Sequence, residues 1–229
     1  MNKTTSLWET VISEGTYHLE MPDELVIRSI NMFKRESPKK ILDVGCGLGR
    51  HIQLFAERGH TVLGVDIALS AIRKSRVKAV PYPRAYLALC DVTHLPVSSN
   101  QFCLVLAWRM LHLNDKDHID DALKDIHRIL RPNGIIICSV RSTSNTLYFK
   151  GKREGREIEP GTFVIDVGGI AGLIYHFFSR QEIETTFSKY FTISSIEEKE
   201  LEHTSYTSND KKHRNWFWII IGRKRGNGD

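Results

Sequence analysis

The sequence of 229 residues has few cysteines and lacks the features that would mark a metal, secreted or membrane protein. Its four cysteines form no CxxC pair, so we expect no zinc site or other metal. No segment approaches the roughly 20 consecutive apolar residues of a membrane span. The first residues carry no apolar core of the kind found in signal peptides. We therefore expect a soluble, cytoplasmic protein.

The composition is that of an ordinary globular chain. Hydrophobic residues make up 41% and charged residues 26%, which excludes a disordered chain. There is no internal repeat and no low-complexity linker, so one domain spanning 1–229 is the expectation. The net charge of +5 is open to two interpretations, a mildly basic surface or contact with nucleic acid or an anionic substrate. The densest basic cluster, at 211–214, lies near the C-terminus, where such runs are usually solvated.

Short apolar runs alternate with segments of helical period from residue 24 to residue 140. The expected strands are 40–44, 61–65, 85–90, 102–107 and 135–140, and the expected helices are 24–34, 49–58 with a stop at Gly59, and 68–79. A further helix begins at Asn114 or Asp115, carries Ile119, Ala122, Leu123, Ile126 and Leu130 at helical spacing, and ends at Pro132-Asn133-Gly134. Its acidic first turn suits the helix dipole.

The pattern changes after residue 140. The glycine-rich segment 141–178 is predicted to be irregular. A capping box at Ser179 starts another helix, and 190–200 and 215–224 read as two strands of an antiparallel pair. This order predicts an α/β fold, a doubly wound, Rossmann-like, mostly parallel seven-stranded sheet with a C-terminal antiparallel hairpin.

The most informative segment is a glycine-rich turn between the first strand and its helix, LDVGCGLGR at 42–50. Glycines there let a ligand lie against bare backbone at the carboxyl end of a sheet. Asp43 suits a cationic group and would repel a pyrophosphate. Asp66, at the end of the second strand, can accept hydrogen bonds from ribose hydroxyls. The spacing is GxGxG, and Arg50 stands where a dinucleotide fold has glycine, so Asp43 and Arg50 disfavour a nucleotide-dependent oxidoreductase.

These residues carry a resemblance to a known family. LDVGCGLGR followed by VLGVD resembles motifs I and II of class I S-adenosylmethionine-dependent methyltransferases, and CDVTHLPVSSNQFCLVLAWRMLHL and IHRILRPNGIIICSV continue it over about 38–140. Within the superfamily the chain looks most like the type-11 group. The segment SRQEIETTFSKYF and the closing hairpin are also similar to tellurite-resistance-type methyltransferases.

The resemblance implies a cofactor, S-adenosylmethionine, and a set of residues around it. Gly45, Gly47 and Gly49 would line its methionine part with Asp43 near the ammonium, Asp66 would hold the ribose, Ile67 would pack on the adenine, Asp91 and Val92 would meet the adenine amino group, and Ala107 and Trp108 would lie beneath the sulfonium. It also implies four parts of the one domain: an N-terminal helical cap (1–37), a cofactor-binding core (38–140), a substrate-side insertion (141–178) and a C-terminal helix and hairpin (179–225).

Several of these positions have an equally ordinary structural interpretation. Asp91 could simply form a turn before Thr93. Trp108 either faces the transferred methyl group or belongs to the core, and it replaces the small polar residue often found there. His112 is a candidate base or a histidine that satisfies backbone groups at a helix start. Arg109, like Arg141, either binds an anionic acceptor or pairs with an acid on the surface.

We expect methyl transfer by in-line displacement to a small-molecule acceptor, with His112 and Arg109 as candidate catalytic residues. The alternatives are a tRNA or RNA methyltransferase, prompted by the pI near 9.0, and a non-catalytic binder of the cofactor. Acceptor specificity is expected from 141–178, whose aromatic residues either form a lid or pack over the sheet: Tyr148, Phe149, Phe163, Tyr175, His176, Phe177 and Phe178. Trp8, Tyr17 and His18 are candidates to close over the cofactor from the N-terminal side.

Overall fold

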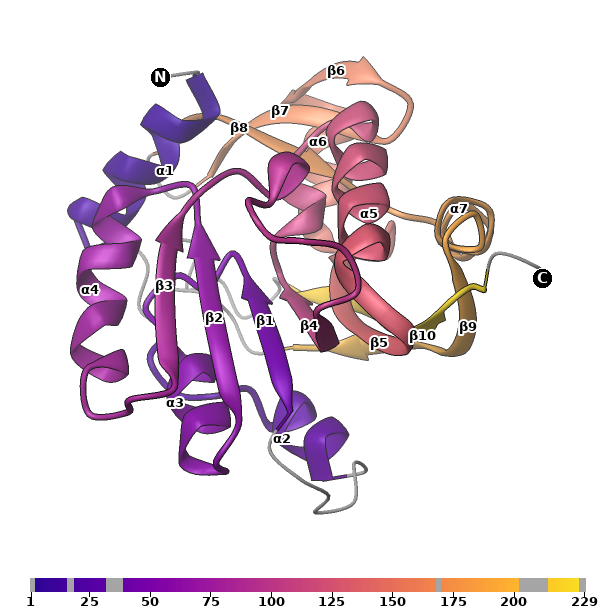
Figure 1. The fold of residues 1–229 in the computed structure, drawn as a ribbon. Helices are drawn as coiled ribbons and strands as arrows, with labels where there is room; N and C mark the ends of the chain where they lie inside the picture. The colour runs from indigo at the N-terminus through magenta and orange to yellow at the C-terminus, as the bar shows by residue number, and fades with distance from the viewer. Residues whose placement is uncertain (1–2, 16–18, 32–38, 168–169, 202–213, 227–229) are drawn as a thin grey trace.

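A seven-stranded sheet forms the centre of the protein (Figure 1). The computed structural model describes residues 3–15, 19–31, 39–167, 170–201 and 214–226. The strand order is β3-β2-β1-β4-β5-β10-β9, parallel from β3 to β5, with β10 antiparallel to both β5 and β9. This confirms the predicted fold and its C-terminal antiparallel hairpin. The strands are β1 (Lys40–Val44), β2 (Thr61–Asp66), β3 (Ala85–Leu89), β4 (Phe102–Trp108), β5 (Leu130–Arg141), β9 (Phe191–Glu200) and β10 (Trp216–Lys224).

Helices cover both faces of this sheet, which is why its middle strands are apolar throughout. Along β4, Val105 and Ala107 join the cluster on the face of α5, whereas Leu104, Leu106 and Trp108 join the cluster on the face of α2 and α3. The helices that flank the sheet are α2 (Glu24–Asn31), α3 (Arg50–Glu57), α4 (Leu69–Ala79), α5 (Lys116–Ile129) and α7 (Arg180–Phe187). The predicted end of the helix 24–34 lies outside the described residues.

The helix ends follow the predicted signals, with one correction. Asp115 caps α5 by accepting a hydrogen bond from His118 N at 3.0 Å, and Gly59 follows α3 with a φ of +79°. Leu130, however, is not helical but begins β5, so the segment 131–134 lies inside the strand's bounds. Both Leu130 and Ile135 pair with β4, and the register shift between them displaces 131–133 to the surface.

The prediction that 141–178 is irregular is wrong. The segment forms α6 (Thr146–Glu154) and a second, antiparallel sheet of β6 (Arg156–Glu159), β7 (Thr162–Val167) and β8 (Ile170–His176). Gly161, with a φ of +81°, makes the tight turn between β6 and β7. Alternate residues of β7 and β8, including Phe163 and Tyr175, are buried against Leu147 of α6. Figure 1 places this sheet at the end toward which β1, β2 and β3 point.

The first helix, α1 (Lys3–Ser13), is tied to α4. Glu9 Oε2 accepts a hydrogen bond from Ser70 N at 3.0 Å, in the first turn of α4. This contact fixes the rotation of α1, whose Trp8 is half-buried between α4 and the small sheet.

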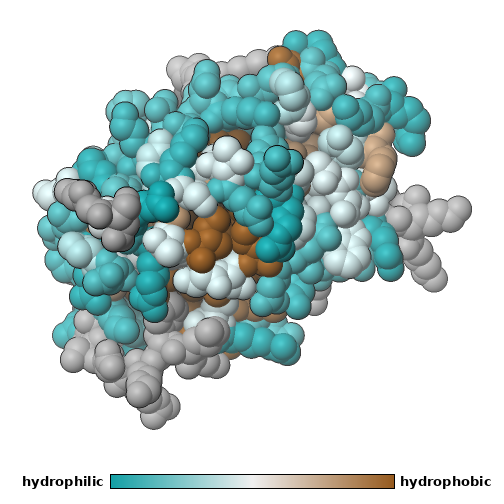
Figure 2. All heavy atoms as spheres, turned by 90° about the vertical axis from the view of Figure 1, so that its right-hand side faces the viewer, coloured by the Kyte–Doolittle hydropathy of each residue, from teal (hydrophilic) through white to brown (hydrophobic). Residues whose placement is uncertain are grey.

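The opposite edge of the molecule, which carries β9 and α7, is hydrophilic around one hollow of hydrophobic residues (Figure 2). Exposed charged residues such as Glu197 and Lys199 stand on the edge strand β9, where charge discourages pairing with another chain. None of the described helices is long and apolar enough to cross a membrane.

Candidate active site

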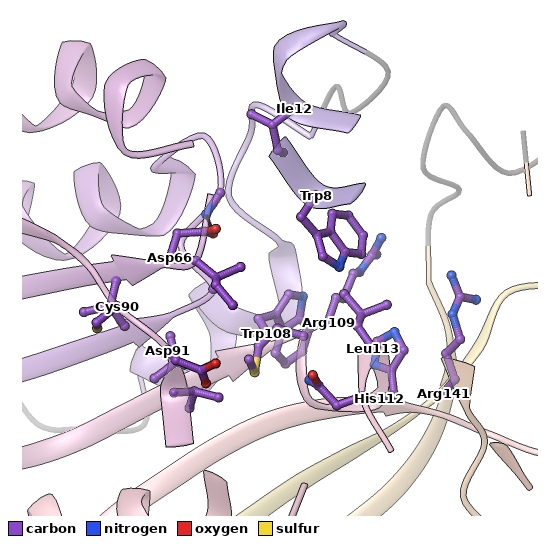
Figure 3. Close-up of a pocket in the computed structure, with 18 of the residues that line it drawn as sticks. Trp8, Ile12, Asp66, Cys90, Asp91, Trp108, Arg109, His112, Leu113 and Arg141 are labelled. Atoms are coloured by element: carbon purple, nitrogen blue, oxygen red, sulfur yellow. Dashed lines mark hydrogen bonds between the residues drawn. The ribbon is translucent and has the colours of Figure 1, made fainter. Parts of the chain in front are cut away.

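A cavity opens at the carboxyl ends of β1, β2, β4 and β5, where open α/β sheets bind ligands (Figure 3). It encloses about 990 Å³ of space, a volume that includes solvent at its open mouth. It is lined by Trp8, Ile12, Val44, Gly45, Gly47, Val65, Asp66, Ile67, Cys90, Asp91, Val92, Trp108, Arg109, Met110, His112, Leu113, Asn114, Arg141 and Phe217.

The two ends of the cavity differ in charge. Figure 3 shows Asp66 and Asp91 at one end, and Arg109, His112 and Arg141 at the other, with Trp8 above the space between them. We call the end formed by Asp66, Asp91 and the glycine turn the acidic side, and the end formed by Arg109, His112 and Arg141 the basic side.

The glycine turn brings main chain to the cavity wall. Gly45 and Gly47 have φ values of +66° and +52°, a conformation that other residues rarely adopt. A Cβ on Gly45 would lie 2.8 Å from Met110 Cβ, so any side chain there would displace the opposite wall. Gly49 does not line the cavity. It packs against Ser75 of α4, where a Cβ would approach Ser75 Cβ to 2.9 Å.

Asp66 closes the turn from the end of β2. Its Oδ2 accepts a hydrogen bond from Gly47 N and its Oδ1 accepts one from Ala68 N, both at 2.9 Å. Burial raises the pKa of the Asp66 carboxyl, and these hydrogen bonds partly offset the rise. Each oxygen retains a second lone pair, so the carboxylate is able to accept hydrogen bonds from a ligand while it holds the turn.

Asp43 lies behind the turn, in β1, and does not line the cavity. It is 1% exposed and its Oδ2 has no hydrogen-bond partner. Burial raises the pKa of the Asp43 carboxyl to about 8, against the lowering effect of Arg50. The carboxyl therefore favours its protonated form at neutral pH and lies behind the glycine turn rather than at the cavity surface.

Asp91 and its neighbours form the floor of the acidic side. Asp91 Oδ1 accepts hydrogen bonds from both Thr93 N and Thr93 Oγ1 at 3.0 Å and caps the short 3₁₀ turn Val92–His94. Asp91 is thus a turn residue that also faces the cavity, together with Val92 and Ile67. Ala107, one residue before Trp108, does not line the cavity.

Trp108 and Arg109 share a partner that the sequence did not reveal. Asp23 Oδ2 accepts a hydrogen bond from Trp108 Nε1 at 3.1 Å and forms an ion pair with Arg109 Nη2 at 3.3 Å. Asp23 Oδ1 accepts a hydrogen bond from Leu25 N at the start of α2. The only local signal for Asp23 is that of a helix cap. Trp108 joins the core and lines the cavity at once, and the ion pair of Arg109 is buried rather than on the surface.

His112 lies on the basic side, in a short 3₁₀ turn before α5. It is 1% exposed, and burial, Arg141 and Arg109 lower its pKa well below the usual range. The main chain of Ser139 hydrogen bonds to the ring, whereas Nδ1 has no partner. The imidazole is therefore neutral, with Nε2–H donated to Ser139 and a lone pair on Nδ1.

Arg141 completes the basic side at the end of β5, together with Phe217 of β10. The guanidinium donates a hydrogen bond from Nη1 to Asn215 Oδ1 at 2.9 Å, and its Cζ lies 5.0 Å from the ring centroids of both Tyr175 and Phe217. Phe217 and Tyr175 also contact His112. The sequence carries no local signal for Phe217, because β10 joins the site only through its pairing with β5.

The structure thus brings seven of the ten predicted cofactor residues to one cavity, and leaves Asp43, Gly49 and Ala107 behind its wall. Both candidate catalytic residues, His112 and Arg109, line the same cavity. Among the described residues of the segment 141–178, Arg141 alone does so, since the aromatic residues pack mainly around α6 and the small sheet. Trp8 lines the cavity as predicted, while Tyr17, His18 and 211–213 lie outside the described residues.

Comparison with known proteins gives the same family as the motifs. Residues 41–134 match a family model described as a methyltransferase domain. A malonyl-[acyl-carrier protein] O-methyltransferase of Hamiltonella defensa is 30% identical over 99 residues, which cover 43% of this chain and 36% of that protein. The mitochondrial arginine-hydroxylase NDUFAF5 of Danio rerio is 33% identical over 145 residues, which cover 57% of this chain and 43% of that protein. The match thus spans less than half the length of either relative.

Solved structures extend the likeness to nearly the whole fold. A 1,6-didemethyltoxoflavin-N1-methyltransferase of Burkholderia thailandensis, solved with 1,6-didemethyltoxoflavin and S-adenosylhomocysteine, has a TM-score of 0.72 and 21% identity and covers 97% of this chain and 87% of that one. The resemblance to the type-11 group and to tellurite-resistance methyltransferases stays a prediction. Residues 41–134 thus match a methyltransferase domain, and the seven-stranded sheet that contains them has the fold of solved S-adenosylmethionine-dependent methyltransferases.

Proposed function

We propose that this chain transfers a methyl group from S-adenosylmethionine, by in-line displacement, to a small-molecule acceptor bound on the basic side of the cavity. One observation carries the proposal: the glycine turn, Asp66 and His112, whose Nδ1 has no hydrogen-bond partner, line the same cavity. A cofactor held at one end and an acceptor at the other would meet beneath Trp8.

The acidic side fits the cofactor by its chemistry. The bare main chain of Gly45 and Gly47 leaves room for the methionine part, and Asp66 has the acceptor oxygens that ribose hydroxyls require. Ile67 and Val92 offer apolar surface beside Asp91 for an adenine. When bound there, S-adenosylmethionine supplies a methyl group on a sulfonium, whose thioether is an excellent leaving group.

The basic side would then supply alignment and, for a protonated acceptor, a base. Neutral His112 is able to take a proton at Nδ1, because its other ring nitrogen is held by the main chain of Ser139. The nearby positive charges of Arg141 and Arg109 disfavour a protonated imidazole. The proton that His112 takes must therefore pass to solvent after each turnover. Trp8 and Leu113 line the same cavity and, with a ligand bound, would limit the access of water, which favours displacement at carbon.

A small acceptor is favoured over RNA by the enclosure of this side. Its cationic groups are almost fully buried, with Arg141 2% and Arg109 8% exposed, whereas phosphate contacts need cations at the surface. The fold itself accommodates a small molecule, since the Burkholderia thailandensis structure of similar fold was solved with 1,6-didemethyltoxoflavin.

The test has two steps. Calorimetry should show binding of S-adenosylhomocysteine and none of NAD. Transfer from methyl-labelled cofactor to a panel of small acids, thiols, amines and tRNA should then label a small molecule, and His112→Gln should lower kcat at least 10-fold if the acceptor is protonated at neutral pH. Label on tRNA together with a steep salt dependence of tRNA affinity would favour the RNA alternative. Tight cofactor binding with no transfer to any member would favour a non-catalytic binder.

A further inference from the structure

The basic side contains a buried cation without a carboxylate. Arg141 is 2% exposed, and among the described residues no Asp or Glu oxygen lies within 4.0 Å of it. Its hydrogen bond goes to the neutral Asn215, its Nε has no hydrogen-bond partner, and two aromatic rings flank it at 5.0 Å. The guanidinium is thus buried, and no carboxylate of the described residues compensates its positive charge.

Arg109, at the end of the neighbouring strand β4, shows how a buried arginine is usually compensated. It is buried to a similar degree but forms an ion pair with Asp23 at 3.3 Å. The two carboxylates that line the cavity, Asp66 and Asp91, stand at its other end and already accept hydrogen bonds from their own loops. No acid of the described cavity wall is therefore placed to neutralise Arg141.

A buried charge is costly unless a partner compensates it, and a guanidinium recognises carboxylate or phosphate through two parallel N–H donors. Because Arg141 lines the cavity beside His112, the missing partner would come from the ligand. We infer that the methyl acceptor carries an anionic head group, a carboxylate or phosphate, that binds Arg141 while its reacting atom faces His112. This rests on the proposed function of the basic side.

The flanking rings narrow the acceptor further. Tyr175 and Phe217 cover Arg141 and also contact His112, with ring centroids 6.3 and 5.4 Å from the imidazole. Two aromatic rings beside the head-group site favour a flat ligand there. An aromatic or conjugated acid fits this description.

The experiment measures binding to the protein saturated with S-adenosylhomocysteine, using benzoate, phenyl phosphate and the neutral benzamide as probes. Benzoate or phenyl phosphate should bind at least 10-fold more tightly than benzamide to the wild type. In Arg141→Met this preference should fall to about 1, while S-adenosylhomocysteine affinity stays within 3-fold. Arg141→Lys should keep part of the preference, because it retains the charge without the fork. The two anions distinguish the head groups.

The control is Arg153→Met, which removes an exposed cation of α6 outside the cavity and should leave the preference for the anion unchanged. If benzamide binds as tightly as both anions, or if Arg141→Met keeps the preference, the inference is wrong. If S-adenosylhomocysteine does not bind the wild type, the proposed function itself fails, so the two failures are separable. Should Arg141→Met not fold, the comparison of wild type with Arg141→Lys decides.

Discussion

The acidic and basic sides of one cavity are built by opposite means. On the acidic side, Asp66 and Asp91 bind the main chain of residues that lie close by in the loops at the ends of β2 and β3 or in the glycine turn. On the basic side, Arg109 depends on Asp23 from before α2, and Arg141 depends on Asn215 beside β10. Main-chain donors hold one end, and side chains remote in sequence hold the other.

This difference indicates which substitutions should disrupt each side of the cavity. A turn held by backbone hydrogen bonds tolerates changes elsewhere, provided that its glycines and its carboxylate remain. A buried cation held by a distant side chain fails when that single partner is lost, because its charge stays behind. Four predictions test the contrast, in order of decreasing effect.

The largest effect concerns the carboxyl behind the acidic side. Asp43 has a pKa of about 8 in the folded protein and an ordinary value near 3.8 when unfolded. Because the raised pKa favours the protonated form in the fold, its contribution to stability is complete below pH 4 and is lost as pH rises through 8. Relative to Asp43→Asn, the free energy of unfolding of the wild type should therefore fall by about 4 kcal/mol between pH 5 and 8.

Denaturant unfolding at a series of pH values measures this slope. Asp121→Asn, at an exposed position of α5, is the control and should leave the pH profile of the wild type unchanged. Parallel profiles for the wild type and Asp43→Asn would show that the Asp43 carboxyl is already ionised in the fold.

The next effect breaks the basic side. Asp23→Ala leaves Arg109 buried without its carboxylate and removes a cap of α2, so the free energy of unfolding should fall by about 3 kcal/mol. This corresponds to a fall in Tm of roughly 10 °C for a chain of this size. The double variant with Arg109→Met should recover part of the loss, since the uncompensated charge is gone. A Tm within 2 °C of the wild type would mean that Arg109 does not depend on Asp23.

The acidic side should lose ligand rather than stability. Asp66→Ala removes two acceptor oxygens for the ribose and releases Gly47, so the affinity for S-adenosylhomocysteine should fall about 100-fold. Calorimetry measures this, with Asp117→Ala at an exposed position as the matched acid control. Unchanged affinity in Asp66→Ala would contradict the cofactor placement, and a cooperative thermal unfolding transition checks that the variant is folded.

The smallest effect concerns the residue that lies above both sides. Trp8→Ala should raise the KM for the acceptor about 10-fold, because the ring covers the space beside Leu113 and shields it from water. S-adenosylhomocysteine affinity should change by less than 3-fold. A conservative Trp8→Phe variant should keep the KM for the acceptor close to that of the wild type. An equal loss for both ligands would show that Trp8 does not distinguish the two sides.

The sequence predicted the main sheet because each of its strands and helices carries its own signal. The glycine turn, Asp66 and the capped start of α5 are local patterns, and local geometry fixes their place. The partners on the basic side could not be predicted in this way. Asp23, Asn215 and Phe217 reach Arg109, Arg141 and His112 only through the packing of α2 and the pairing of β10 with β5.

The small sheet was missed for a related reason. The glycines of 141–178 predict an irregular segment, whereas Gly161 lies in a two-residue turn and Gly151 is packed against Phe163, where a Cβ would come within 2.8 Å of the ring. Alternation of buried residues along β7 and β8 was present but short. The expected role of this segment also changed, since apart from Arg141 it supports the cavity from behind through Tyr175.

The carboxylate of Asp23 serves three groups at once, the first turn of α2, the indole of Trp108 and the guanidinium of Arg109. In evolutionary terms such a residue is hard to exchange, because any replacement disturbs a helix, a core side chain and a cation together. Arg141 has one hydrogen bond to a side chain and two ring contacts. A substitution at Arg141 would therefore disturb fewer structural elements than a substitution at Asp23.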